Sequence, residues 1–213
     1  MKNTITFSIF TLVLIASANA QQSLTNTYAG TLKIPSNGGI STAMDDITRV
    51  FNVRTCTETV RSSSPVTYYT ITNTTLSNVL ENIINSNTNY IWRYEQQTET
   101  FYIQPKTNAV SMYYFGSISS TNMLFKEFLD SSNISQLKKN GVDFIFARPE
   151  IRLKNEHINL EFENAYLWQI LDAISIQLPH VIGWKIQEVD PKRGCKYGIN
   201  FSFSPEFYKR KTD

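Results

Sequence analysis

The chain has 213 residues, of which 41% are hydrophobic and 18% are charged, and its formal net charge at pH 7 is +2. This composition is too apolar for wholesale disorder, and a near-neutral charge does not favour electrostatic binding of nucleic acid. Two cysteines and two histidines are too few for a disulfide-rich miniprotein or an array of zinc ribbons. The sequence therefore predicts a folded protein that does not bind nucleic acid.

The N-terminus has the features of a secretory signal peptide. Lys2 precedes an apolar run over residues 5–16, which is followed by a small-x-small signal-peptidase motif. The run is shorter than the roughly 20 residues that a membrane-spanning helix needs. We predict a signal peptide over residues 1–20, cleavage between Ala20 and Gln21, and no transmembrane segment in the mature chain. Export would place the protein in the periplasm, at the outer membrane or outside the cell.

Export also bears on the two cysteines. Cys56 and Cys195 would lie in an oxidising compartment, where two cysteines allow one intramolecular disulfide. Sequence spacing cannot show whether their Cβ atoms meet, so two separate thiols are the alternative. We therefore predict a Cys56–Cys195 disulfide, which requires the fold to bring the two residues together.

One sequence pattern occurs twice, over residues 69–83 and again over residues 160–174. A tryptophan followed by a basic residue comes after each copy, at Trp92 and at Trp184. The aligned pairs are Ile71 with Phe162, Asn73 with Asn164, Leu76 with Leu167, Leu80 with Leu171, Glu81 with Asp172, and Ile83 with Ile174. The pairs indicate that the chain contains an internal structural repeat.

The second copy predicts a strand, a helix and two further strands. Apolar and polar residues alternate over 158–162, which is typical of a strand with one buried face. An apolar stripe at helical spacing follows over 167–178, with Asn164 as the expected N-cap. Segments 181–189 and 197–203 have the composition of closing strands.

The first copy predicts the same order, and a strand, a helix and a short strand precede each copy. In the first half the expected segments are 31–34, 40–51, 53–57, 66–71, 74–85, 90–95 and 100–104. Upstream of the second copy they are 111–118, 123–129 and 142–148. The sequence thus predicts an α+β protein in which a β-α-β-β-α-β-β sandwich occurs twice, with the helices on one face of each small sheet.

These elements predict a domain organisation. After the signal peptide we expect a flexible segment over 21–29, a first module over 30–105 and a linker over 106–110. A second module over 111–203 and a C-terminal tail over 204–213 complete the chain. A single merged domain is the competing organisation.

The second module resembles the secretin and TonB short N-terminal (STN) domain. The resemblance is carried by a strand that enters a Pro-containing turn over 141–151, and by the alternating strand and helix over 158–171. Residues 32–105 are similar, and they also resemble the related C-terminal module of anti-sigma regulators of iron uptake. The resemblance implies a periplasmic module that docks other proteins. Residues 204–213 have no counterpart of the family's outer-membrane pore or barrel, so we do not expect a transport function.

Catalytic and metal-binding patterns are weak in this sequence. His157 and His180 lack a Gly-x-Ser-x-Gly nucleophile motif, and neither CxxC, HxxxH nor a phosphate-binding loop occurs. Glu161 and Glu163 share one strand face and could support acid–base hydrolysis. However, an exposed face is a poor place to tune a carboxylate. We predict a non-enzymatic protein without metal or cofactor, and a hydrolase using these two residues is the least favoured hypothesis.

Aromatic residues make up 13% of the chain and supply the candidate binding residues. Exposed aromatics beside a free strand edge suit docking by strand addition, or stacking on sugars. We predict binding through Tyr68, Thr70, Tyr113 and Tyr114, with packing between modules as the alternative role. The leading hypothesis is an exported adaptor that binds an envelope protein, such as an outer-membrane channel or receptor, through sheet edges or the inter-module groove. A periplasmic protein that binds a small ligand or glycan is the alternative.

Overall fold

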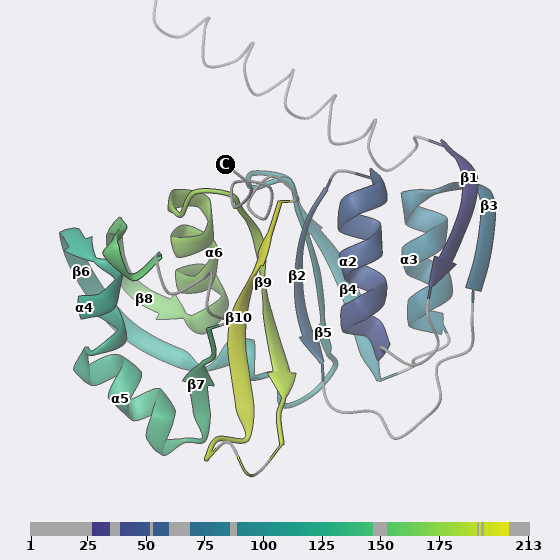
Figure 1. The fold of residues 1–213 in the computed structure, drawn as a ribbon. Coiled ribbons are helices and arrows are strands. Elements are labelled where there is room, and N and C mark those ends of the chain that lie inside the picture. The colour runs from purple at the N-terminus through teal and green to yellow at the C-terminus, as the bar shows by residue number, and fades with distance from the viewer. Residues whose placement is uncertain are drawn as a thin grey trace, which may run out of the picture.

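The computed structural model describes residues 27–34, 39–51, 53–59, 69–85, 89–146, 153–190, 192 and 194–204. The described strands are β1 (Thr27–Ile34), β2 (Arg54–Thr59), β3 (Tyr69–Thr75), β4 (Tyr90–Glu95), β5 (Thr100–Pro105), β6 (Tyr114–Leu124), β7 (Val142–Phe144), β8 (His157–Tyr166), β9 (Val181–Glu188) and β10 (Tyr197–Phe203). The helices are α2 (Gly39–Phe51), α3 (Leu76–Asn85), α4 (Phe125–Leu129), α5 (Ser132–Lys139), α6 (Leu167–Gln177) and the 3-10 helix η1 (Val110–Met112). The predicted α+β class is confirmed (Figure 1).

A mixed sheet lies at the centre of the described fold, with the strand order β4-β5-β2-β9-β10-β7. β2 runs parallel to β5 on one side and to β9 on the other, and β7 runs parallel to β10. The β4–β5 and β9–β10 pairs are antiparallel. Two antiparallel ribbons, β1–β3 and β6–β8, stand apart from this sheet. The pairings among β1 to β5 therefore recur among β6 to β10.

The central sheet separates two hydrophobic cores of the described residues. Phe101 and Ile103 of β5 belong to the core beneath α2 and α3, whereas Tyr102 between them belongs to the core around α6. Because successive residues of a strand point to opposite faces, the two cores lie on opposite faces of the sheet. Figure 1 shows the layers in order: β1–β3, then α2 and α3, the central sheet, α6, and β6–β8.

Amphipathic spacing explains why the helices form where the sequence predicts them. The buried side chains of α2 and α3 recur three or four residues apart, so each helix presents one apolar stripe to the sheet. These residues are Ile40, Ala43, Met44, Ile47, Leu76, Val79 and Leu80. Burial of a stripe of this kind, rather than intrinsic helix propensity, supplies most of a short helix's stability.

The structure differs from two separate sandwiches, because strands from both halves of the chain form one sheet. The junction is the β2–β9 pair, in which Thr57 lies opposite Lys185 and Glu58 opposite Ile186. The β2 sequence is polar and carries no clear signal for burial, yet four of its six residues are buried. Helices consequently cover both faces of the shared sheet, although each half has its helices on one face.

Element boundaries in the second half also differ from the prediction. Met123 and Leu124 end the long strand β6, where Met123 pairs with Ile158, so the helix expected over 123–129 begins two residues later. The sequence did not predict α5 as a separate helix. Asn164 is not an N-cap, because pairing with β6 continues β8 to Tyr166, which is the N-cap residue of α6.

Some predicted segments fall partly or wholly outside the described residues. The signal peptide over 1–20, Tyr68 and most of the tail over 204–213 belong to this group. The segment 21–29 was expected to be flexible, but its last residues form the start of β1, which pairs with β3.

The predicted linker over 106–110 leads into η1, which a buried carboxylate fixes to the sheet. The Val110 N–H donates to Glu58 Oε1 at 2.5 Å, and the Ser111 N–H donates to Glu58 Oε2 at 2.8 Å. Glu58 lies in β2 and is only 1% exposed. Both oxygens of its carboxylate are therefore used to hold the connection between the two halves.

Glu58→Ala is expected to lower the free energy of unfolding by about 2–3 kcal/mol, because it leaves the buried Ser111 N–H and the half-buried Val110 N–H without their acceptor. It should also loosen the connection, so that trypsin cuts faster after the exposed Lys106. Urea denaturation and timed proteolysis measure the two effects. Glu163→Ala, on the exposed face of β8, is the control and should change stability by less than about 0.5 kcal/mol. Equal cleavage rates in the two variants would contradict the role given to Glu58.

Candidate functional site

Two tyrosines form an exposed aromatic pair at the end of the β6–β8 ribbon. Tyr114 and Tyr166 lie directly opposite each other, are 55% and 39% exposed, and have ring centroids 5.8 Å apart at an interplanar angle of 69°. The Tyr114 hydroxyl donates a hydrogen bond to Asn164 Oδ1 at 2.6 Å. We call Tyr114, Asn164 and Tyr166 the tyrosine patch. It presents apolar ring surface together with polar groups, a combination that is common at binding surfaces.

The other predicted binding residues have different positions. Tyr113 is half-buried, packs edge-on against Phe115, and accepts a hydrogen bond from the Leu167 N–H at 2.9 Å through its carbonyl. It therefore anchors the start of α6, and its contacts with Phe115 and Leu167 lie within the second half of the chain rather than between the two modules. Thr70 lies in β3 opposite Lys33. Tyr68 lies outside the described residues.

A buried polar cluster surrounds Asp172 on α6. The Tyr102 hydroxyl of β5 donates to Asp172 Oδ2, and Trp184 Nε1 of β9 donates to Oδ1 at 2.6 Å. The Cys56 thiol of β2 lies 3.6 Å from the same Oδ1. These four side chains are at most 5% exposed. We call them the Asp172 cluster, and it joins strands of the first half to the helix and strand of the second.

Two arginines add further contacts around this cluster. Arg54 Nη2 of β2 donates to Ser175 Oγ at 2.8 Å, and the Ser175 hydroxyl donates to the Asp172 carbonyl at 2.9 Å. The Arg93 guanidinium of β4 lies 3.9 Å from the Tyr102 ring centroid and 4.5 Å from that of Trp168. The Arg54–Ser175 and Arg93–Trp168 contacts span the two halves, so the cluster is part of a continuous junction.

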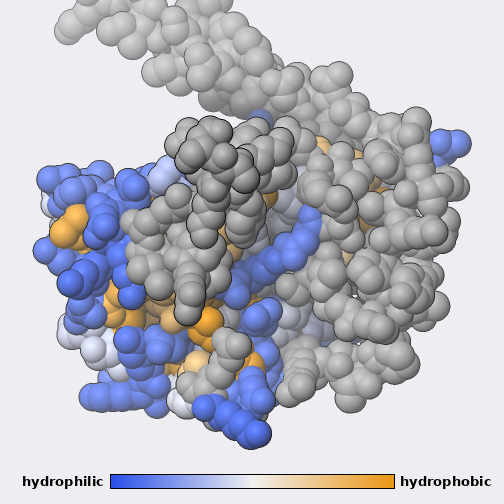
Figure 2. Space-filling model, in the orientation of Figure 1, coloured by the Kyte–Doolittle hydropathy of each residue, from blue (hydrophilic) through white to orange (hydrophobic). Residues whose placement is uncertain are grey.

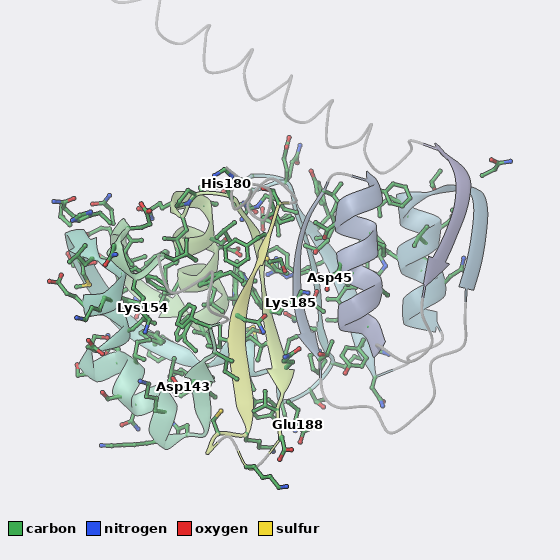
Figure 3. The ribbon with its side chains drawn as sticks, in the orientation of Figure 1. Asp45, Asp143, Lys154, His180, Lys185 and Glu188 are labelled. Carbon is green, nitrogen blue, oxygen red and sulfur yellow. The ribbon has the colours of Figure 1, made fainter. Side chains whose placement is uncertain are left out.

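A salt bridge supports the same junction on the other face of the sheet. Lys185 of β9 pairs with Asp45 of α2, and Figure 3 shows the two side chains between these elements. Lys185 is mostly buried, whereas Asp45 is exposed. The side-chain contacts of the junction therefore lie on both faces of the sheet.

Burial sets the ionisation of the Asp172 cluster. It raises the pKa of Asp172, although the hydrogen bonds from Tyr102 and Trp184 act in the opposite direction. Burial, followed by the proximity of Asp172, also raises the pKa values of Cys56 and Tyr102. Perturbed groups of this kind occur at active sites, but these side chains are closed to solvent. Their geometry fits a structural junction better than a reaction site.

The structure does not form the predicted Cys56–Cys195 disulfide. Cys56 lies in the middle of the sheet beside Asp172, whereas Cys195 lies in the β9–β10 connection next to Lys196, which pairs with Val189. In the parallel β2–β9 pair Cys56 is level with Trp184, and Val189 lies five residues further along the chain. At ~3.3 Å per residue this separation corresponds to about 16 Å. A disulfide needs Cα atoms within about 7 Å, so the strand positions keep the two sulfurs apart.

The remaining candidates for chemistry lie on the surface. Ile158 and Leu160 are buried while Glu161 and Glu163 are exposed, as the alternating pattern predicts. Glu161 Oε2 accepts a hydrogen bond from the Ser119 hydroxyl at 2.8 Å. Within the part of the chain that the structure describes, no group of three or more His, Cys, Asp or Glu side chains is placed to hold a metal ion.

No family model, curated protein or solved structure matches this chain. Among the described helices, none has both the length and the apolar character needed to cross a bilayer. The function therefore has to be argued from this chain's own residues.

Neither the Asp172 cluster nor the Glu58 contact was predicted from the sequence. Asp172 aligns with Glu81, which is exposed on α3, so the repeat gave no signal that Asp172 is buried. The helical pattern gave no signal either, because at about 100° per residue Asp172 lies about 100° from Leu171 and about 160° from Ile174, away from the apolar stripe.

Proposed function

We propose that this protein is an exported, non-enzymatic adaptor of the bacterial cell envelope that docks a protein partner through the tyrosine patch. The observation that carries the proposal is the pair of exposed rings of Tyr114 and Tyr166 at the end of a two-stranded ribbon. Tyrosine is enriched at protein interfaces, where a few such residues supply most of the affinity. The predicted signal peptide supports the envelope as its location.

The proposal includes a tandem arrangement of two STN-like modules. It is supported by the recurrence of the strand pairings, since β1–β3 corresponds to β6–β8 and β4-β5-β2 corresponds to β9-β10-β7. The order strand, helix, two strands, helix, two strands also recurs, with α4 and α5 in place of one helix. Family members with this order dock proteins, as the resemblance implies, and the family supplies no catalytic residues.

The Asp172 cluster also favours a non-enzymatic role. Its carboxylate, phenol and thiol are directed at one another, and their burial leaves them to stabilise the junction. Glu161 and Glu163, the residues of the hydrolase hypothesis, lie on an exposed strand face where carboxylates are well solvated.

A glycan-binding function through the same patch is the second candidate. The Asn164 amide lies beside two exposed aromatic rings, and this combination of an amide with ring faces suits a sugar as well as a protein. The two functions predict different ligands for one surface, so one set of variants tests both.

The test compares wild type with the double variant Tyr114→Ser/Tyr166→Ser. A photo-crosslinker at position 114 identifies the bound envelope protein, and its affinity for purified wild type and variant is then measured. We expect the variant to lose at least about tenfold in affinity, since exposed aromatic anchors dominate such interfaces. Thermal-shift screening with cell-wall fragments and simple sugars is run in parallel.

The control is Ser119→Ala/Glu161→Ala, which changes another directly opposed pair on the same ribbon. It should bind within about twofold of wild type, because it leaves the aromatic anchors in place. Equal binding by wild type and the tyrosine variant would refute the proposal. Stabilisation of wild type by a sugar, but not of the tyrosine variant, would instead assign the patch to glycan binding.

A further inference from the structure

The central sheet ends in two different edge strands. Within the described residues, β4 pairs only with β5, and β7 pairs only with β10. The surface at the β7 end is partly apolar: Phe144, Ile145 and Phe146 are half-buried. Figure 2 shows hydrophobic surface over the lower part of β7 and β10. These two edges lie at opposite ends of the same sheet.

The two edge strands correspond to the two strands that already meet in the middle of the sheet. β4 is antiparallel to β5 as β9 is to β10, and β7 is parallel to β10 as β2 is to β5. The β2–β9 junction is thus a pairing between a β7-like edge and a β4-like edge. Within the described residues, each copy of the protein makes this junction once and has one edge of each kind left at its ends.

The direction of the backbone groups agrees with this correspondence at the β4 end. The Lys106 N–H donates to the Asn89 carbonyl, and the Val189 N–H donates to the Lys196 carbonyl. Because hydrogen-bonded positions alternate along an antiparallel pair, Trp92 in β4 and Trp184 in β9 both turn their backbone groups away from their hairpin partner. The backbone N–H and C=O groups of Trp184 thereby point toward β2. Those of Trp92 point in the corresponding direction, toward the outer edge of the sheet.

The same reasoning applies at the β7 end. The Ile145 N–H donates to the Ile199 carbonyl, so the backbone groups of Ile145 point toward β10 and those of Phe144 point outward. The Phe144 N–H is covered by its neighbour, since it donates to Asp143 Oδ1 at 2.8 Å, and Asp143 pairs with Lys138 at 3.6 Å. Asp143 is labelled beside β7 in Figure 3. A charged group on an edge strand limits strand addition, so any pairing here is weak and concentration-dependent.

We infer that copies of this chain associate head to tail, with β4 of one copy added in parallel to β7 of the next. A junction between two different edges is heterologous, and its repetition gives a ring or an open filament. The helices of the two halves lie on opposite faces of the sheet, so a further half added at β7 would have the orientation of the first half. The partner class is therefore a second copy of this chain.

The register of the β2–β9 junction, carried over to the two edges, specifies the contact. Thr57 lies opposite Lys185 in the existing junction. The repeat aligns Trp92 with Trp184 and Lys185 with Arg93. When the β10–β7 register is continued two residues past the end of β7, the cross-strand partners also align Thr57 with Phe146. Phe146 should thus lie opposite Arg93 of the second copy, and Phe144 opposite Ile91 of the second copy.

Photo-crosslinking tests this register. A benzoylphenylalanine replaces Ile91, which is 38% exposed, in the purified full-length chain, and light scattering measures the oligomeric state as the concentration rises. We expect a crosslinked dimer in which the label is joined to residues 142–146. The same label at Ile176, which is 55% exposed on α6, is the matched control and should not reach these residues. A chain that remains monomeric at its highest soluble concentration, or a crosslink that maps elsewhere, would overturn the inference.

Asp143→Ala supplies a second measurement. Removing the carboxylate uncovers the outward N–H of Phe144, so self-association should strengthen by at least about threefold. Asp190→Ala is the control, because Asp190 Oδ1 also accepts from a nearby backbone N–H, that of Lys192, but lies away from both edges. Equal association of the two variants would refute β7 as the receiving edge. The tyrosine patch lies on neither edge, so the partner-binding test and this one can fail independently.

Discussion

Asp172→Ala is expected to lower the free energy of unfolding by about 2–4 kcal/mol. The substitution removes the acceptor of the Tyr102 hydroxyl, the Trp184 indole N–H and the Cys56 thiol, all of which are buried. Each donor would lose its partner in a site that water does not reach, and the variant would also contain a small cavity. Urea denaturation followed by tryptophan fluorescence measures the change, since Trp184 itself is part of the cluster.

Glu81→Ala is the matched control for this prediction. Glu81 has the corresponding position on α3 and is exposed, so its removal should change stability by less than about 0.5 kcal/mol. Asp172→Asn should fall between the two, because the amide retains one acceptor oxygen but places a donor group against the other donors. If Asp172→Ala were as stable as Glu81→Ala, the cluster would not hold the two halves together.

The pH dependence of stability gives an independent measure of the same carboxyl group. Burial raises the pKa of Asp172, so the folded protein keeps this proton at pH values where the unfolded chain has lost it. Its contribution to stability is full below the ordinary pKa of aspartate and is lost as pH rises through the raised value. The stability of wild type relative to Asp172→Asn should therefore decrease as pH rises across this window. A difference that stays constant with pH would show that the carboxyl group is not perturbed.

The sequence predicts the local elements well because their signals are local. The alternation of β8 and the apolar stripe of α6 depend only on residues close in the chain, and strands β4 and β10 occur at the predicted residues. The β2–β9 pairing has no such signal. It buries a strand of threonines, a cysteine and a glutamate, and only contacts with distant segments explain why these residues are buried.

The candidate site was predictable to a similar extent. Tyr114 is exposed as predicted, whereas Tyr113 packs inward, and strand alternation alone indicates that two neighbouring tyrosines cannot both face solvent. Tyr166 was not recognised, because its position opposite Tyr114 depends on the register of β6 with β8. Register between strands that are far apart in sequence is set by pairing and bulges, and neither can be deduced from composition.

Gly183→Ala is expected to destabilise the protein by about 3 kcal/mol or more, because it forces apart two paired strands at the β2–β9 junction. A Cβ atom on Gly183 would lie 2.0 Å from the Thr55 carbonyl oxygen and 3.0 Å from its carbonyl carbon. Both are backbone atoms of the neighbouring strand, so the overlap can be relieved only by moving β9 away from β2. That movement would also pull Lys185 away from Asp45 and the Trp184 ring away from the ring of Tyr102, whose centroid lies 6.1 Å from it across the junction.

Gly194→Ala is the control that isolates this close approach. Gly194 has a positive φ of 77°, but a Cβ atom added there would meet no atom of a non-adjacent described residue within 4 Å, so substitution should cost only the backbone penalty of about 1–2 kcal/mol. Chemical denaturation of the two variants under the same conditions gives the comparison. A Gly183→Ala variant no less stable than Gly194→Ala would mean that β2 and β9 are not in contact, and that the two halves do not share one sheet. The contact at Gly183 is thus the most direct test of the junction on which the head-to-tail register depends.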